Sequence, residues 1–296
     1  MFAYAFARML IEQYGSESDP LVANFKRCGS SAYSSWGDSL QYFNVKPYTT
    51  DNADLILKYG SFRQRLSYLV YMLWTRLPLL GKSAYTLNIE QALRRIGLHF
   101  TGAADAAYPL VGRCSREFVR GYFQDRRFFS PIRSQLLHEF TPKQPPLRHN
   151  EGLYEQALRS DSVCVSVRRG DYLSEQYRKD FHVCTPDYYR AAFKAVTQRI
   201  AHPVFIFFSD DIAWVRENMT VEGFPCYYER GDDPVWETLR LMYSCHHFII
   251  SNSTFAWWAQ YLGNREGKLV VCPSSWFANP DWHSNLVNDD FIFINT

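Results

Sequence analysis

The sequence predicts an α/β protein, and three observations lead to that fold class. The chain has 296 residues, which at about 150 residues per domain indicates two domains or one large one. Hydrophobic residues make up 47% and aromatic residues 17%, so the chain can build sizeable cores and general disorder is excluded. In the second half, short apolar or β-branched runs alternate with helical patterns, which is typical of a parallel sheet covered by helices.

The first half has the pattern of mixed helices and loops. It begins with MFAYAFARMLIEQYG, whose apolar residues have the spacing of an amphipathic helix. Residues 141–150 (TPKQPPLRHN) contain three prolines and no apolar period, which indicates a crossing between domains. We therefore expect one domain over residues 1–145 and a second over residues 146–296.

The second half should contain four strands and three helices in alternation. The run VFIFFS is continuously apolar, as expected of a strand buried on both faces. The helix after the first strand has Thr185 placed as N-cap and Pro186 at its first position. The strands are expected over residues 162–167, 204–209, 248–250 and 269–272, and the helices over 185–200, 235–245 and 254–262.

Charge and cysteine content exclude several classes of protein. Thirty-two Lys and Arg against thirty Asp and Glu leave a net charge of +2, so no strong overall field holds nucleic acid, and any anion site must be local. The seven cysteines are scattered without a C-x-x-C pair, which favours reduced thiols in a cytoplasm over a zinc site or a disulfide framework. No signal peptide is visible, and the longest apolar run, Leu66 to Trp74, is far shorter than the ~20 residues of a membrane span. Peripheral contact with a membrane stays open.

Polar side chains follow three of the predicted strands. The first strand runs into residues 168–171 (RRGD), the second ends in residues 209–211 (SDD), and the third ends in residues 251–254 (SNST). The carboxyl ends of parallel strands lie at one edge of the sheet, where open α/β sheets bind ligands. We therefore expect these three clusters to converge on one crevice.

The arginine pair is the first candidate for ligand binding. Arg168 and Arg169 can grip a phosphate through bidentate, charge-assisted hydrogen bonds, and Gly170 allows a close backbone path. In the alternative interpretation both arginines are solvated or paired with Asp171 and Glu175. Their position directly after a buried strand favours phosphate contact.

The helix that follows the third strand is a second candidate for an anion site. Ser253 or Thr254 would cap it, and the free N–H groups of its first turn attract anions, although capping alone needs no ligand. Neither a Walker-A loop nor a G-x-G-x-x-G motif is present, so an ATPase or a dinucleotide oxidoreductase has no support.

Three acids complete the candidate set. Asp210 and Asp211 are adjacent, and adjacent side chains of an extended chain point to opposite sides, so a helix cap or a ribose contact is favoured over a metal site. Glu237 lies on the helix before the third strand. Its carboxylate could accept two N–H bonds from a guanine edge, with a surface acid as the alternative.

Together, SVCVSVRRGDYL, FFSDDIAWV and FIISNSTFAWWAQYLG resemble the bacterial α-1,2-fucosyltransferases, glycosyltransferase family 11. GYFQ at residues 121–124, followed by Phe128 and Phe129, looks like another element of that family, and MFAYAFARML looks like the helix after its N-terminal glycine-rich loop. The resemblance implies a GT-B-like enzyme of two Rossmann-type α/β domains facing a cleft. It also implies transfer of L-fucose from GDP-β-L-fucose to the 2-hydroxyl of a galactoside in a surface glycan, with inversion and without metal or cofactor.

The resemblance also assigns roles to residues. Arg168 and Arg169 match the pair that holds the donor diphosphate, and Glu237 falls near the guanine-binding acid. Arg169 is the expected catalytic cation, and Asp171 and Glu175 are the candidate proton acceptors. The expected donor-binding residues are Ser166, Arg168, Arg169, Ser209, Asp210, Glu237, Asn252, Ser253 and Thr254.

Two departures from the family pattern qualify these expectations. Ser166 stands where the family usually has a histidine, so the imidazole's role is lost or moved, which directs attention to His182. The family's opening strand and Gly-Gly-Leu-Gly-Asn-Gln loop are not found, so we expect an incomplete N-terminal domain.

Three other functions have weaker support. Residues 169–171 form the adhesion tripeptide Arg-Gly-Asp, but adhesion requires an exposed tip rather than the end of a buried strand. Eight Trp and twenty Tyr would suit a sugar-binding protein without catalysis. A transferase that uses another nucleotide sugar is the nearest enzymatic alternative. The expected location is cytoplasmic, with possible contact at the inner face of the membrane.

Overall fold

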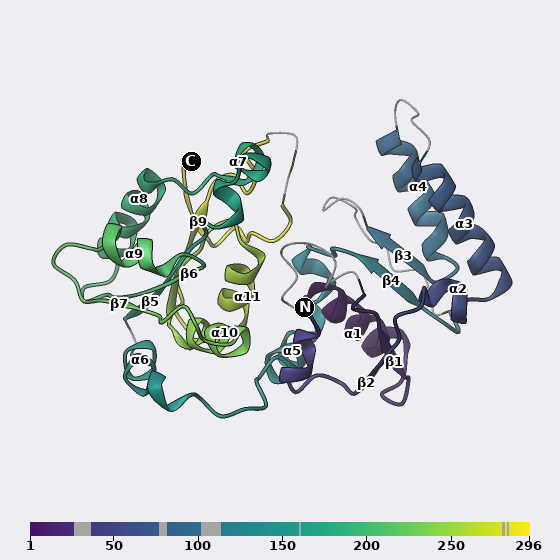
Figure 1. Ribbon diagram of the computed structural model, residues 1–296, viewed down its shortest axis with the longest axis horizontal. Helices are drawn as coiled ribbons and strands as arrows, with labels where there is room; N and C mark the ends of the chain where they lie inside the picture. Colours follow the sequence, from purple (N-terminus) through teal and green to yellow (C-terminus); the bar gives the residue numbers. More distant parts are fainter. Residues whose placement is uncertain (27–36, 77–81, 102–113, 160, 280–281, 283) are drawn as a thin grey trace. The chain divides into compact units, whose positions relative to one another are not determined.

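The chain divides into two compact units, residues 1–139 and 140–296. This computed structural model describes residues 1–26, 37–76, 82–101, 114–159, 161–279, 282 and 284–296, without the side chains of 82–87 and 101 (Figure 1). The boundary between the units lies just before the proline-rich segment 141–150.

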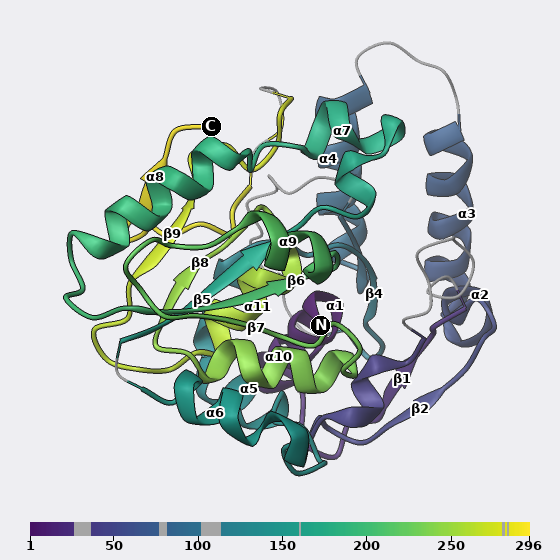
Figure 2. The ribbon, with the colours of Figure 1, turned by 60° about the vertical axis from the view of Figure 1, so that its left-hand side comes forward.

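The second unit is built on a six-stranded parallel sheet, in the strand order β10-β9-β8-β5-β6-β7 (Figure 2). All six residues of β5, the strand with the sequence SVCVSV, are buried, as expected of a central strand in a parallel sheet. The strands are β5 (Ser162–Val167), β6 (Val204–Ser209), β7 (Cys226–Tyr228), β8 (His247–Ile249), β9 (Val270–Pro273) and β10 (Ile292–Ile294).

Helices cover both faces of this sheet. On one face, α8 and α9 pack on apolar residues of β5 and β6 to form the main core; α10 and α11 contact each other on the opposite face (Figure 1). The helices are α6 (Glu151–Ala157), α7 (Glu175–Phe181), α8 (Pro186–Thr197), α9 (Ile212–Asn218), α10 (Val235–Ser244) and α11 (Thr254–Leu262).

The four strands and three helices predicted from the sequence are all present, with ends that shift by a few residues at most. The prediction missed β7 and β10, which have only three residues each and show no usable alternation. It also missed three short helices, α6, α7 and α9, whose seven residues span barely two turns.

The described residues of the first unit do not form the single Rossmann-type sheet that was expected. They form two separate pairs of parallel strands, β1 with β2 and β3 with β4. The strands are β1 (Leu21–Ala23), β2 (Tyr48–Thr50), β3 (Leu98–Thr101) and β4 (Phe118–Gly121). The helices are α1 (Phe2–Tyr14), α2 (Leu55–Tyr59), α3 (Phe62–Arg76), α4 (Lys82–Arg94) and α5 (Arg133–Glu139).

The predicted N-terminal helix is present as α1, and aromatic side chains hold it in the first unit. The ring of Phe6 stacks on Phe123 with 4.2 Å between centroids and meets Phe128 edge-on at 5.1 Å. Phe123 adopts a positive φ of 49°, which is uncommon for a residue other than glycine. This cluster joins α1 to the GYFQ segment noted in the sequence.

The structure bears on two further expectations. The six cysteines among the described residues are free thiols, and Cys28 lies outside these residues. In the part of the chain that is described, no helix has the length and apolarity to cross a membrane.

Candidate functional site

The strand order of the second unit reverses at β5. From β5 the chain proceeds outward through β6 and β7, and then returns to the other side of β5 for β8, β9 and β10. Open α/β sheets bind ligands where the strand order reverses in this way, beside the carboxyl ends of the two diverging strands. Here those ends lead into residues 168–171 and 250–254.

The two arginines after β5 form ion pairs with three aspartates. Arg168 lies 2.7 Å from Asp171 and 2.9 Å from Asp210, measured between nitrogen and carboxylate oxygen. Arg169 Nε donates to Asp211 at 3.0 Å. Of the pairing with Asp171 and Glu175 considered in the sequence, only the contact with Asp171 is therefore present. These ion pairs hold Arg169 and Asp171 in place, whereas an adhesion tripeptide needs an exposed, flexible tip.

Packing fixes the orientation of both guanidinium groups. Arg169 Cζ lies 3.3 Å from the ring centroid of Trp214, and Arg168 Cζ lies 5.5 Å from that of Tyr172. The ion pair of Arg169 uses Nε, so its terminal nitrogens make no hydrogen bond with the residues described here. These nitrogens are the donors available to an anionic ligand.

Gly170 allows the backbone after β5 to approach the end of β6. The N–H of Arg169 donates to Asp210 Oδ1 at 2.9 Å, and a Cβ added at Gly170 would come within 2.4 Å of Asp210 Oδ2. Any larger residue would therefore displace this carboxylate and disturb its ion pair with Arg168.

The N-terminus of α11 follows β8, on the other side of this reversal point. Ser253 is its N-cap residue, but the side chain makes no capping hydrogen bond, contrary to the expectation that a hydroxyl would cap this helix. The first intrahelical bond runs from Trp257 N–H to the Ser253 carbonyl at 2.9 Å. Ser253 and Thr254 are both half-buried, so their hydroxyls and the first-turn amides suit an anion.

Ser166, one of the predicted donor-binding residues, lies near the carboxyl end of β5. Ser166 is buried, with its hydroxyl 3.3 Å from that of Ser251 across β5 and β8. Two tyrosines of α8 brace this point: Tyr189 OH donates to the Ser166 carbonyl at 3.0 Å, and Tyr188 OH donates to the Ile250 carbonyl at 2.6 Å.

Asn252 and Ser209 order the loops that follow β8 and β6. The buried Asn252 amide donates to the carbonyls of Phe181 at 2.9 Å and Trp276 at 2.8 Å. The Ser209 hydroxyl accepts the N–H of Asp211 at 3.0 Å. In this conformation both side chains are engaged by the protein itself.

Glu237 is fully buried and holds the segment before β5. Its Oε1 accepts the Leu147 N–H at 3.0 Å and the Asn150 amide at 3.1 Å, and Arg240 lies 3.6 Å from Oε2. A cavity of about 450 Å³ beside this segment is lined by polar and aromatic residues, among them His149, Asn150, Tyr227, Tyr228 and Arg230. The surface-acid alternative for Glu237 is therefore wrong, whereas its contact with guanine stays a prediction.

The candidate proton acceptors differ in environment. Asp171 is tied to Arg168, whereas Glu175 is exposed at the first position of α7. His182 follows α7, and burial together with the positive charges of Arg178 and Arg169 lowers its pKa. This shift favours the neutral imidazole, which is the form that can accept a proton.

Glu229 is a buried acid beside the site that the sequence analysis missed. It directly follows β7, is only 3% exposed, and its Oε1 accepts the Ser209 N–H at 2.8 Å. Burial, reinforced by the charges of Asp233 and Asp210, raises its pKa to about 7. The signal, an acid at a strand end, was present in the sequence, but the strand was too short to be recognised.

The site has an excess of negative charge. Arg168 and Arg169 contribute two positive charges, and Asp171, Asp210 and Asp211 contribute three negative ones. An anion there needs donors beyond the arginines, which the N-terminus of α11 can supply. Among the residues with described positions, no group of three or more His, Cys, Asp or Glu is arranged to hold a metal ion.

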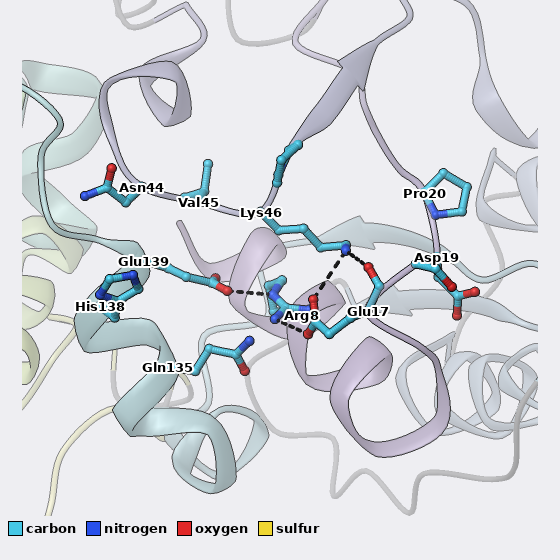
Figure 3. Close-up of a pocket in the computed structure, with 12 residues that line it drawn as sticks. Arg8, Glu17, Asp19, Pro20, Asn44, Val45, Lys46, Gln135, His138 and Glu139 are labelled. Carbon is cyan, nitrogen blue, oxygen red and sulfur yellow. Dashed lines mark hydrogen bonds and ion pairs between the residues drawn. The ribbon is translucent and has the colours of Figure 1, made fainter.

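The first unit contains a separate polar cavity of about 560 Å³ (Figure 3). Arg8 lies between Glu17 and Glu139 with 2.9 Å to each carboxylate, and Lys46 approaches Glu17. Arg8 is only 1% exposed, so this network fastens α1 to α5 and to the loops beside them. Such mixed donors and acceptors can also bind hydroxyl groups, but no residue predicted from the sequence lines this cavity.

The sequence is similar to those of several glycosyltransferases. It is 29% identical over 202 residues to the O-antigen biosynthesis glycosyltransferase WbnK of Escherichia coli, covering 62% of this chain and 65% of that protein. It is 31% identical over 178 residues to an alpha-1,2-colitosyltransferase of Escherichia coli, covering 57% and 59%. It is 30% identical over 145 residues to human galactoside alpha-(1,2)-fucosyltransferase 1, covering 46% and 40%.

The matches cover less than two thirds of the length of these relatives. No solved structure matches significantly. The family model for glycosyl transferase family 11 matches residues 107–289, which is more than half of the chain and includes the whole parallel sheet except its last strand. The resemblance seen in the sequence motifs is thereby confirmed: the chain belongs to glycosyl transferase family 11.

Proposed function

We propose that this chain is a galactoside α-1,2-fucosyltransferase. It transfers L-fucose from GDP-β-L-fucose to the 2-hydroxyl of a galactose in a glycan, with inversion at the anomeric carbon. In the GT-B arrangement that the family resemblance implies, the second unit binds the donor and the first unit contributes to acceptor binding.

The observation that carries the proposal is the pairing of two anion-binding features at the reversal point of the sheet. Arg168 and Arg169 leave β5 on one side, and the N-terminus of α11, without a side-chain cap, follows β8 on the other. A diphosphate bound between them would receive guanidinium donors from one side and backbone amides from the other. Membership of glycosyl transferase family 11 supports a nucleotide sugar as the source of that diphosphate.

The proposed reaction places its greatest charge change where these donors lie. The bond between fucose C1 and the phosphate oxygen breaks, the electron pair leaves with GDP, and the acceptor oxygen bonds to C1 from the opposite face. Negative charge accumulates on the diphosphate, and preorganised donors stabilise such charge more than they stabilise the ground state. We therefore assign Arg169 to the leaving diphosphate, because its terminal nitrogens are not engaged by the protein.

The acceptor hydroxyl must also lose a proton. Asp171 and Glu175 are the acceptors expected from the sequence, which also directed attention to His182; the lowered pKa of His182 favours its neutral form. We favour His182 over Asp171, because the Asp171 carboxylate is already engaged in its ion pair with Arg168. His182 would then assume the role of the histidine that Ser166 replaces.

A second candidate donor follows from one comparison. The similarity to an alpha-1,2-colitosyltransferase makes colitose an alternative to fucose as the transferred sugar. Both alternatives use the same diphosphate site, so they differ in the donor's sugar rather than in the chemistry.

Thermal unfolding with added nucleotides tests the donor class. We expect GDP and GDP-fucose to raise the melting temperature, and ADP and UDP-sugars to leave it unchanged. Equal shifts with all nucleotides would remove the guanine assignment, and no shift with any of them would remove the nucleotide-sugar site. A GDP-linked colitose that shifts the temperature more than GDP-fucose would favour the second candidate.

A further inference from the structure

Helix α3 of the first unit exposes apolar side chains on the face that should be polar. Five of them, Phe62, Leu66, Leu69, Val70 and Leu73, are between 48% and 82% exposed. Their spacing of i, i+4, i+7, i+8 and i+11 places them in one stripe along the helix. A helix of a globular protein normally turns such a stripe toward the core.

The opposite face of α3 already supplies the contacts with the first unit. Tyr68 is buried and its ring stacks with Phe100 of β3 at 6.0 Å between centroids, and Tyr71 stacks with Phe100 at 4.8 Å. The buried Gln64 amide donates to the carbonyls of Ile96 and Arg116. The helix therefore has an inner face of aromatic and polar contacts and a second, apolar face that is exposed among the residues the structure describes.

The charges carried by α3 itself all have one sign. Helix α3 carries three arginines and no acidic residue. At 3.6 residues per turn, Arg63 lies at one edge of the stripe, and Arg65 and Arg76 lie at the other. All three are exposed. An apolar stripe bordered by cations is the pattern of helices that lie in the interface of an anionic bilayer.

We propose that α3 docks this chain onto an anionic phospholipid surface, with the stripe inserted among the acyl chains and the arginines at the phosphates. With 15 residues the helix is about 22 Å long, which suits lying in the membrane plane rather than crossing it. A second copy of the chain is a poorer occupant, because two such helices would bring six arginines together without an acid between them.

Vesicle flotation of the full chain tests this proposal. We expect binding to vesicles of phosphatidylcholine mixed with phosphatidylglycerol, little binding to phosphatidylcholine alone, and weaker binding at high salt. Leu69→Glu combined with Leu73→Glu should weaken binding at least tenfold, since both leucines lie in the stripe. Arg63→Gln and Arg76→Gln should each weaken it about fivefold.

Leu158→Glu is the matched control, since Leu158 is equally exposed but lies in the second unit. It should bind vesicles like the native chain. The proposal is overturned if the native chain binds no vesicles or if the Leu69→Glu, Leu73→Glu chain binds equally well. If the native chain is a dimer and these two substitutions convert it to a monomer, the stripe is instead the contact with a second copy. A large loss of thermal stability in the pair would show that the stripe is covered within the chain, and would equally overturn the proposal.

Discussion

At the residue scale, the site after β5 depends on acids that hold cations in place. Asp210 accepts the Arg169 N–H and pairs with Arg168, and Asp211 pairs with Arg169. The motif RRGD indicated the arginines from the sequence alone. It did not indicate that the second aspartate cluster orients them, because that relation exists only once β5 and β6 pair in register.

Replacing Arg169 should separate catalysis from folding. We expect Arg169→Ala to lower the rate of fucosyl transfer at least about a hundredfold, the effect of losing one preorganised donor, and to weaken GDP binding. The free energy of unfolding should change little, because Arg169 is near the surface and its partner Asp211 remains solvated. Arg190→Ala, at an exposed arginine of α8, is the control for both measurements. Near-normal turnover in Arg169→Ala would place the site elsewhere.

Because the pKa of Glu229 is raised, this residue should make the folded chain less stable as the pH rises. Its pKa is about 7 in the folded chain against 4.5 when exposed, so its contribution to stability is present below pH 4.5 and is lost as the pH rises through 7. Glu229→Gln keeps an acceptor for the Ser209 N–H without the charge. We therefore expect chemical denaturation to show that the free energy of unfolding of Glu229→Gln rises by about 2–3 kcal/mol relative to that of the native chain between pH 5 and pH 8. The control Glu222→Gln, at an exposed position after α9, should show no such trend. If the free energies of unfolding of Glu229→Gln and the native chain differ by the same amount from pH 5 to pH 8, Glu229 does not titrate in that range.

At the element scale, the N-terminus of α11 combines helix capping with anion binding. Ser253 has the extended backbone of an N-cap residue but makes no side-chain capping bond. The sequence showed the helix and its polar start, because FAWWAQYL is strongly apolar and SNST precedes it. It could not show whether the hydroxyl is used by the helix or left for a ligand.

Ser253→Asp should have opposite effects on stability and on donor binding. Aspartate is at least as good an N-cap as serine, so the melting temperature should hold or rise. Its negative charge would face the proposed diphosphate, and we expect GDP binding measured by calorimetry to weaken at least tenfold. Ser253→Asn is the neutral control, which caps equally well and should bind GDP far better than Ser253→Asp. Equal affinities of the two variants would exclude a diphosphate at this helix.

At the scale of the whole molecule, the central strands and long helices of the second unit were predictable, whereas of the first unit only the N-terminal helix was. The parallel sheet follows from β-branched and apolar runs such as SVCVSV and VFIFFS, whose burial leaves few alternatives. In the first unit the four strands have three or four residues each, so no period could be recognised. The network of Arg8 with Glu17 and Glu139 joins residues far apart in the chain, which local sequence patterns do not reveal.

The exposed stripe of α3 was visible in the sequence only as an apolar run. Residues 66–74 could have formed the core of a buried helix, and only the structure shows which of them face outward. If α3 docks on a lipid surface, the whole chain, with its proposed donor site, is held at that surface; the docking proposal itself does not depend on the proposed function.

The most direct test of the central proposal is analysis of the reaction product. The full chain is incubated with GDP-β-L-fucose and a β-galactoside, in the presence of EDTA, and the product is examined by mass spectrometry and NMR. We expect the addition of one fucose, α-linked to O2 of galactose, because arginines and helix amides rather than a metal are proposed to stabilise the leaving diphosphate. Absence of a fucosylated product, or linkage to a different oxygen, would contradict the proposed function; activity that EDTA abolishes would contradict the proposed role of the arginines.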